Sequence, residues 1–415
     1  MTPPPDVFSP ARLGPLTLRN RIIKAATYEN MAREGLVTEA LIDYHVAHAQ
    51  GGLGMTTVAY CAVEPAGRTD GRQIVWRDEA VPGLRRLTDA VHATGAAVSA
   101  QVGHSGPVND PRKTGTKALA PSRYAQMASM SVARAVTPAD MGRVRDLTAN
   151  AVLKAIESGF DAVELHVGHN YLLSAFLSPR LNRRRDAYGG SLTNRARFPR
   201  EVLAAAREAA GDRIAVIVKM NMADGVRGGF DIDEAQTVAE WIEADGSVDA
   251  FEFTEGSSLL NPMYLFKGDV PLKEFANAMP PLMRPAVRMF GGAMLREYPY
   301  SDTFLLPHAL RMRERLSTPI ILLGGVTDAA AMDTAMAQGF EFVAMGRALL
   351  REQDLPRRIQ ADRSTRALCD HNNTCMATTF ALTHCRLAAP DQRPGARLGQ
   401  DGLQPLHTAG AGKAA

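Results

Sequence analysis

Two histidines and a tyrosine stand close together near the middle of the sequence. His166 ends a short apolar run, and His169 and Tyr171 follow it directly. Two imidazoles that converge on one oxygen would polarise a carbonyl or nitro group, and a phenol beside them could protonate a carbon that gains negative charge. Taken singly, such residues are usually ordinary buried loop side chains. Their grouping indicates a site where a polarised substrate accepts a proton on carbon.

A second group of residues has the pattern of a phosphate site. The segments ILLGGVTD and FVAMGRALL place Gly324, Gly325 and Gly346 after apolar runs, and Arg347 follows the last glycine. Glycines that open onto helix N-termini expose backbone N–H groups to phosphate, and an arginine adds charged donors. Many barrels bind phosphate in this way, so the pattern predicts a phosphate group without identifying the ligand.

Short apolar runs that alternate with longer segments of helical period would position these residues. This alternation predicts parallel strands joined by right-handed crossovers. Eight such units favour a closed (β/α)₈ barrel, an α/β fold, whose chemistry lies at the C-terminal ends of the strands; an open doubly wound sheet is the alternative. The predicted strands are Arg21–Thr27, Met55–Cys61, Ala97–Gln101, Ala162–His166, Ala215–Asn221, Ala250–Thr254, Ile320–Leu323 and Phe342–Ala344, with helices at Ala80–Ala93, Met141–Ser158, Arg197–Ala210 and Asp233–Ala244.

The segment from Gly159 to Val202 carries a specific combination of motifs. It contains H-x-x-H-x-Y, then F-L-S-P, N-x-R-x-D-x-Y-G-G-S and N-R-x-R-F. This combination resembles the old yellow enzyme family, and the resemblance extends over roughly residues 7 to 350. It implies a TIM barrel with FMN as cofactor and NAD(P)H as transient electron donor. The implied activity is that of an ene reductase, which transfers hydride through flavin N5 to an activated C=C bond.

The resemblance also implies roles for individual residues. His166 and His169 would hold the substrate oxygen, and Tyr171 would donate the proton. Gln101 would face the flavin pyrimidine, and Lys219 would lie near flavin N1 and C2=O, where a cation stabilises the charge of reduced flavin. The expected cofactor contacts are Ala25, Ala26, Thr27, Tyr28, Tyr60, Gln101, His166, Lys219, Gly324, Gly325, Gly346 and Arg347.

The sequence departs from the family pattern at three positions. Tyr28 stands where the family has Thr or Cys near flavin C4=O, and Tyr60 stands where small residues usually face the N5 edge. Pro107 replaces the arginine that commonly ends the Q-L-x-H-x-G-R motif. These differences bear on the redox potential and the substrate, and they leave the expected cofactor unchanged.

Three of the four cysteines follow the predicted barrel. Cys369, Cys375 and Cys385 resemble part of the [4Fe–4S] motif of larger relatives similar to 2,4-dienoyl-CoA reductase and trimethylamine dehydrogenase, but Asn372 occupies the second position. A cubane cluster usually needs four thiolates, so no metal is expected. The alternatives are a vestigial motif and a three-ligand metal site completed by His371 or His384.

Two other functions remain open at this point. Some relatives with the cysteine motif run oxidation or demethylation with FMN, so an oxidative dehydrogenase or demethylase is the first alternative. The second is a barrel that binds a phosphorylated ligand without redox chemistry.

The domain organisation follows from the same pattern. Residues 1–385 are expected to form one FMN-binding barrel, which begins with a hairpin over Phe8–Leu18. The long insertion at residues 261–308 is expected to act as a lid. Residues 386–415, rich in Ala, Gly, Pro and Gln, are expected to form a flexible tail.

Charge and hydropathy limit the partners. The net charge of +3 and the absence of a basic block argue against nucleic acid. No apolar run approaches the roughly 18 residues of a membrane span, the N-terminus lacks the pattern of a signal peptide, and four cysteines are too few for a disulfide framework. We therefore expect a cytoplasmic enzyme whose partner is a small molecule, an activated alkene, with homo-oligomerisation left open.

Overall fold

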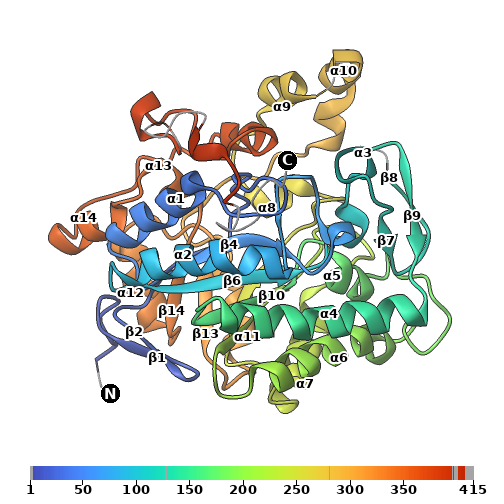
Figure 1. Cartoon of the computed structure of the whole chain (residues 1–415), viewed down its shortest axis with the longest axis horizontal. Helices are drawn as coiled ribbons and strands as arrows, with labels where there is room; N and C mark the ends of the chain where they lie inside the picture. Colours follow the sequence, from blue (N-terminus) through green and yellow to red (C-terminus); the bar gives the residue numbers. More distant parts are fainter. Residues whose placement is uncertain (1–2, 127–128, 280, 395, 397–400, 407–415) are drawn as a thin grey trace, which may run out of the picture.

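The computed structural model describes residues 3–126, 129–279, 281–394, 396 and 401–406, and its centre is a closed barrel of eight parallel strands (Figure 1). The predicted closed barrel is confirmed and the alternative of an open sheet is wrong, because β3 pairs with β14 on one side and with β4 on the other. All eight predicted strands are present. They are β3 (Ile22–Lys24), β4 (Met55–Ala62), β6 (Ala97–Gly103), β10 (Ala162–Val167), β11 (Ala215–Asn221), β12 (Ala250–Thr254), β13 (Ile320–Leu323) and β14 (Phe342–Met345).

The bottom of the barrel is closed by the expected hairpin. Strands β1 (Ala11–Leu13) and β2 (Leu16–Leu18) pair antiparallel. Leu13 and Leu18 pack against barrel residues such as Ile217 and Phe342 in one buried apolar cluster. This cluster fills the N-terminal end of the barrel with apolar side chains and leaves polar chemistry to the other end.

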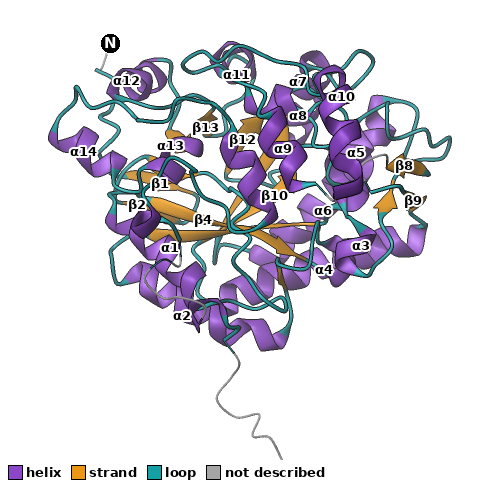
Figure 2. Cartoon of the chain, turned by 90° about the horizontal axis from the view of Figure 1, so that it is seen from above, coloured by secondary structure: helices purple, strands orange, loops and turns teal. Residues whose placement is uncertain are grey.

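Helices surround the barrel (Figure 2). Two of them begin earlier than the sequence pattern predicts, because their first turns are stabilised by capping residues. Thr137 and Asp140 form a capping box at the start of α4, and the Ser191 hydroxyl accepts from Asn194 N at the start of α6. The surrounding helices are α1 (Glu39–Gln50), α2 (Val81–His92), α4 (Pro138–Glu157), α6 (Leu192–Ala210), α7 (Ile232–Ala244), α11 (Leu306–Arg313), α12 (Ala329–Ala337), α13 (Arg347–Arg351) and α14 (Leu355–Ala361).

The insertion between β12 and β13 is helical. It contains α8 (Pro262–Phe266), α9 (Leu272–Ala278) and α10 (Arg284–Met294), and α11 follows. Met263 and Leu295 of the insertion share a buried cluster with Met376 of the C-terminal segment. Figure 1 shows α9 and α10 and this C-terminal segment on the same side of the barrel.

The chain after residue 386 returns to the barrel. Leu406 N donates to Val37 O at 2.9 Å, and Thr38 and Pro405 form an isolated bridge. The Leu406 side chain also packs against the main hydrophobic core, so part of the expected tail contacts the barrel, while its flexibility stays a prediction. Residues 407–415 of the expected tail lie outside the described residues. Among the helices that are described, none has both the length and the apolar character needed to cross a membrane.

Candidate functional site

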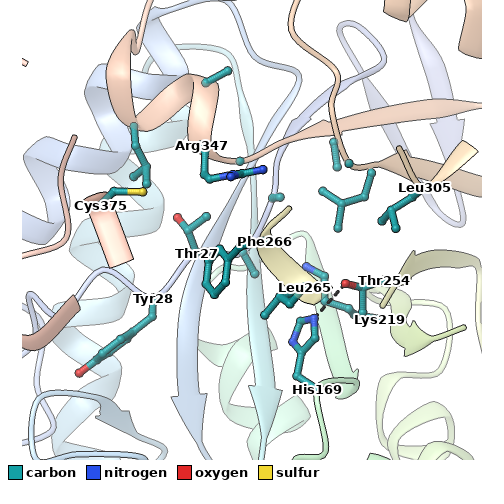
Figure 3. Close-up of a pocket in the computed structure, with 18 of the residues that line it drawn as sticks. Thr27, Tyr28, His169, Lys219, Thr254, Leu265, Phe266, Leu305, Arg347 and Cys375 are labelled. Carbon is teal, nitrogen blue, oxygen red and sulfur yellow. Dashed lines mark hydrogen bonds between the residues drawn. The ribbon is translucent and has the colours of Figure 1, made fainter. Parts of the chain in front are cut away.

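A cavity of about 300 Å³ opens at the C-terminal ends of the barrel strands (Figure 3). Every residue that the sequence singled out for chemistry or cofactor binding lines it. These are Ala25, Ala26, Thr27, Tyr28, Tyr60, Gln101, His166, His169, Tyr171, Lys219, Gly324, Gly325, Gly346 and Arg347. Figure 3 shows Arg347 and Cys375 toward one end of the cavity and His169, Lys219 and Thr254 toward the other.

The two histidines and Tyr171 form one aromatic group on the cavity wall. The ring centroids of His166 and His169 are 5.1 Å apart, and the Tyr171 ring meets His166 edge-on at 4.4 Å. His166 lies in β10, whereas His169 and Asn170 take left-handed backbone angles in the loop that follows. This sharp turn brings His169 back beside His166.

Residues from neighbouring strands hold His169 in place. His169 Nε2 is 2.9 Å from Thr254 Oγ1, and the His169 backbone N–H donates to Asn221 Oδ1 at 3.0 Å. Asp224 accepts from Asn170 Nδ2 at 2.9 Å and from Asn221 Nδ2 at 3.3 Å. No sequence motif marks these supporting residues, and the only signal for them is that Asn221 and Thr254 end predicted strands.

Burial fixes the protonation of the group. It lowers the pKa of His169 to about 3 and the pKa of His166 well below its usual value; nearby Lys219 acts in the same direction. Burial, assisted by the Asp70 carboxylate, raises the pKa of Tyr171. At neutral pH the site therefore holds two uncharged imidazoles and a protonated phenol.

Lys219 and Gln101 are joined below the cavity by a buried carboxylate. Glu164 Oε1 accepts from Gln101 Nε2 at 2.6 Å and from Lys219 Nζ at 3.1 Å. Burial alone would lower the pKa of Lys219, but Glu164 and Glu252 outweigh that effect and raise it. Lys219 is therefore a fixed cation at the cavity wall.

The opposite end of the cavity requires glycine. Gly324 and Gly325 have φ values of +95° and +82°; an added Cβ would lie 2.6 Å from Leu305 Cγ and 2.5 Å from Thr303 N, respectively. Beside them, Arg347 Nη1 donates to Lys267 O at 3.0 Å and to Asn373 Oδ1. The glycines are therefore required by close packing against Leu305 and Thr303, and they line the same cavity as the Arg347 guanidinium, a group that binds phosphate well.

The two unusual tyrosines turn their hydroxyls away to other partners. Tyr28 OH donates to Asp70 Oδ1 at 2.5 Å, and Tyr60 OH donates to Gly67 O at 2.7 Å. The Tyr60 ring also meets the Tyr171 ring edge-on at 5.4 Å. Both therefore contribute to the cavity walls chiefly through their rings.

About half of the remaining lining residues come from two segments, the insertion and the cysteine segment after α14. The insertion, expected to be a lid, supplies aromatic and aliphatic walls, and the segment after α14 supplies a third side. No carboxylate lines the cavity in the part of the chain that the structure describes. The further lining residues are Thr254, Ser258, Leu265, Phe266, Phe304, Leu305, Leu323, Val326, Thr327, Ala344, Ala348, Leu350, His371, Cys375, Met376, Thr379 and Thr383.

The cysteine segment holds no recognisable metal site. The described residues contain no group of three or more His, Cys, Asp or Glu side chains that could bind a metal ion. His384 Nδ1 lies 2.6 Å from Leu382 O, and His371 stacks on Tyr300 with centroids 3.4 Å apart. Burial raises the pKa of Cys375 to about 11 despite the nearby Arg347 cation.

We accordingly expect protein purified without oxygen to lack stoichiometric iron and sulfide. The physical reason is that Asn372 cannot replace the second thiolate, since its amide binds Asp370 Oδ2 at 3.0 Å. Iron and acid-labile sulfide analysis of the anaerobic protein checks this. The amount of protein-bound flavin in the same sample serves as the reference for correctly folded protein. About four irons and four sulfides per chain would contradict the prediction.

Comparison with known proteins identifies relatives over most of the chain. The model of the NADH:flavin oxidoreductase / NADH oxidase family matches residues 6–257. A 4,4'-dithiodibutanoate disulfide reductase of Rhodococcus erythropolis is 48% identical over 400 residues, which cover 96% of this chain and 99% of that protein. An NADH oxidase of Thermoanaerobacter brockii is 29% identical over 368 residues, 88% of this chain, and the aligned region spans only 52% of that longer protein.

Solved structures agree on the fold. An old yellow enzyme homologue from Zymomonas mobilis superposes with a TM-score of 0.69 at 22% identity, covering 89% of this chain and 96% of that one. The family match overturns the alternative of a non-redox phosphate-binding barrel, because the family consists of flavin oxidoreductases.

The family uses FMN and takes electrons from NAD(P)H, and the cavity fits the FMN. Lys219 and Arg347 supply cations for an anionic cofactor, and Gly324 and Gly325 line the same cavity. His166 Nδ1 is buried in the cavity wall without a hydrogen-bond partner, which is costly unless a ligand satisfies it. From the barrel, the cavity and these matches together, we conclude that the chain belongs to the NADH:flavin oxidoreductase / NADH oxidase family and is an NAD(P)H-dependent flavin oxidoreductase.

Proposed function

We propose that the protein is an ene reductase that acts on α,β-unsaturated carbonyl compounds or nitroalkenes. The observation that supports this most directly is the group of two neutral imidazoles and one protonated phenol on a single wall of the cavity. When bound, FMN supplies hydride at its N5 atom after reduction by NAD(P)H. His166 and His169 bind the substrate oxygen, and Tyr171 transfers its hydroxyl proton to the α-carbon.

The other lining residues have cofactor-binding roles in this proposal. Gln101 and Lys219 bind the pyrimidine end of FMN. Gly324, Gly325, Gly346 and Arg347 bind its phosphate, and Ala25, Ala26, Thr27, Tyr28 and Tyr60 form the walls around the ring system. Residues 1–385, including the insertion, act as one FMN-binding domain.

A second candidate is reduction of a disulfide. It is favoured by the relative named for 4,4'-dithiodibutanoate, which is similar over nearly the whole chain. A relay through protein thiols is not supported, because burial raises the pKa of Cys375, which lines the cavity, to about 11 and leaves it un-ionised. In this candidate the disulfide binds in the cavity in place of the alkene and is reduced there directly.

A comparison of oxidants separates the two candidates. Holoenzyme reduced anaerobically with NAD(P)H is mixed in a stopped-flow instrument with an enone, a nitroalkene, a dicarboxylate disulfide or, as control, buffer. We expect the enone and nitroalkene to reoxidise the flavin fastest. Reoxidation by the disulfide alone would contradict the ene reductase proposal. Flavin reduction by amines instead of NAD(P)H would favour the oxidative dehydrogenase.

Replacing Arg347 tests the phosphate placement. Arg347→Ala removes a charge-assisted hydrogen bond of about 1.5–3 kcal/mol, so the dissociation constant of FMN is expected to rise roughly ten- to a hundredfold. Fluorescence titration of apoprotein with FMN measures this. Arg351→Ala is the matched control, since Arg351 lies one turn further in α13 and its Nη1 is 3.9 Å from Cys385 Sγ. Equal FMN affinity in the two variants would show that the phosphate binds elsewhere.

A further inference from the structure

Four polar side chains from adjacent strands face one another inside the barrel, directly below the cavity. In the strand register, Gln101 of β6 lies opposite Glu164 of β10, and Lys219 of β11 lies opposite Glu252 of β12. Side chains alternate between the two faces of a strand. These four therefore point inward together, and only Gln101 and Lys219 reach the cavity wall.

The contacts make Lys219 the centre of this group. Lys219 Nζ is 2.6 Å from Glu252 Oε1 and 3.1 Å from Glu164 Oε1, and all three side chains are at most 3% exposed. Glu164 is also bonded to Gln101 Nε2. On its other side Glu252 pairs with the apolar Ile321 of β13. The charged groups that act most strongly on Glu252 are Lys219 from β11 and Glu164 from β10. Lys24 of β3, itself paired with Glu29 at 3.4 Å, acts on Lys219 and Glu164 in turn.

This arrangement carries one carboxylate too many. Two buried ammoniums, Lys219 and Lys24, face three buried carboxylates, those of Glu164, Glu252 and the Lys24 partner Glu29. Full ionisation would leave a net charge of −1 in a site shielded from water, which is unfavourable. A bound proton removes that charge. In agreement, burial and the Glu164 charge raise the pKa of Glu252 to about 7, even though Lys219 opposes the shift. Glu252 can therefore gain or lose a proton near neutral pH.

We propose that Glu252, acting through its contact with Lys219, takes up a proton from solvent when the FMN bound beside Lys219 is reduced. This rests on the proposed placement of Lys219 at the pyrimidine end of the cofactor. Reduction adds negative charge there, and a like charge close to a carboxylate favours its protonated form. The two electrons come from NAD(P)H as hydride and go to FMN. Glu252 gains only a proton and is neither oxidised nor reduced.

The test counts protons against electrons in the holoenzyme. The midpoint potential of bound FMN is measured with a reference dye from about pH 6 to about pH 9, a range that brackets the titration of Glu252. If reduction takes up one additional proton per two electrons, the midpoint potential falls more steeply with rising pH, by about 30 mV per pH unit. We expect this steeper region in the wild-type protein and its loss in Glu252→Gln. An equally steep dependence in Glu252→Gln would overturn the proposal.

Two further variants separate the role of Glu252 from general damage. Glu252→Asp keeps a carboxylate and should keep the additional proton. Glu255→Gln removes another buried carboxylate, one that binds His308 instead of Lys219, and should behave like wild type. Lys219→Met should change the midpoint potential itself. An unchanged midpoint potential in Lys219→Met would show that Lys219 does not lie at the pyrimidine end of FMN. If the potential changes in Lys219→Met but proton uptake is not lost in Glu252→Gln, only the role of Glu252 is overturned.

Apoprotein provides a readout if Glu252→Gln retains no FMN. The folded-state pKa of about 7 for Glu252 lies above that of an unfolded glutamate. The folded protein therefore binds this proton more tightly, and the wild type should lose stability relative to Glu252→Gln as pH rises from about 4 through about 7. Urea unfolding of both apoproteins across this range measures the difference. Parallel pH profiles would overturn the proposal.

Discussion

Replacing Tyr171 with Phe should slow reoxidation of the reduced enzyme by an enone by about 10²–10⁴, the usual contribution of a positioned general acid. Reduction of the flavin by NAD(P)H should remain nearly unchanged. The phenol is partly buried, protonated at neutral pH and packed edge-on against His166. In the proposed function it acts only in the step in which a carbon takes up a proton. The substitution keeps the ring and removes only the hydroxyl.

Stopped-flow measurement of each half-reaction separates this role from packing. Tyr60→Phe is the matched control, because the Tyr60 ring contacts Tyr171 while its hydroxyl donates to Gly67 O. A nitroalkene should be reduced with much less loss than an enone in Tyr171→Phe, since its nitronate is stable before protonation. Equal slowing of flavin reduction and enone reduction would mean that Tyr171 serves only to shape the flavin pocket.

Removing both imidazoles should have the other large effect. His166→Ala combined with His169→Ala should weaken enone binding and slow its reduction together, because in the proposed function both rings donate to the oxygen that gains charge. A single donor of this kind is worth about 10²–10³ in rate. Reduction by NAD(P)H should slow as well, since we expect nicotinamide to bind in the same cavity.

The pH dependence gives an independent check on the histidines. With the pKa of His169 near 3 and that of His166 also far below its usual value, neither ring changes charge between about pH 5 and about pH 8. The rate constant for enone reduction should therefore show no histidine titration in this range.

His104→Ala is a suitable control for the double histidine variant, because His104 is buried against Glu64 and does not line the cavity. Unchanged enone binding and rate in the double variant would exclude the proposed oxygen site.

The sequence by itself was sufficient to predict the barrel and to select residues that share one cavity. Eight apolar runs of strand length separated by helical segments specify parallel strands, and the carboxyl ends of such strands converge at one face of a barrel. Residues as distant in sequence as Thr27, Gln101 and Arg347 were therefore expected to meet, and they do. The motif around His166 is local, so its turn could be recognised without knowing the rest of the structure.

The tertiary structure decided which side chains complete and control that cavity. Leu265 and Met376 reach it from segments whose paths no periodicity predicts, and Thr254 is bonded to His169 across 85 positions of sequence. In the sequence, Glu252 is the one charged residue of a predicted strand that is otherwise mostly apolar. Only the register of β11 against β12 places it at Lys219. Such contacts depend on strand alignment and on the closure of long loops, and these are fixed by packing of the whole chain.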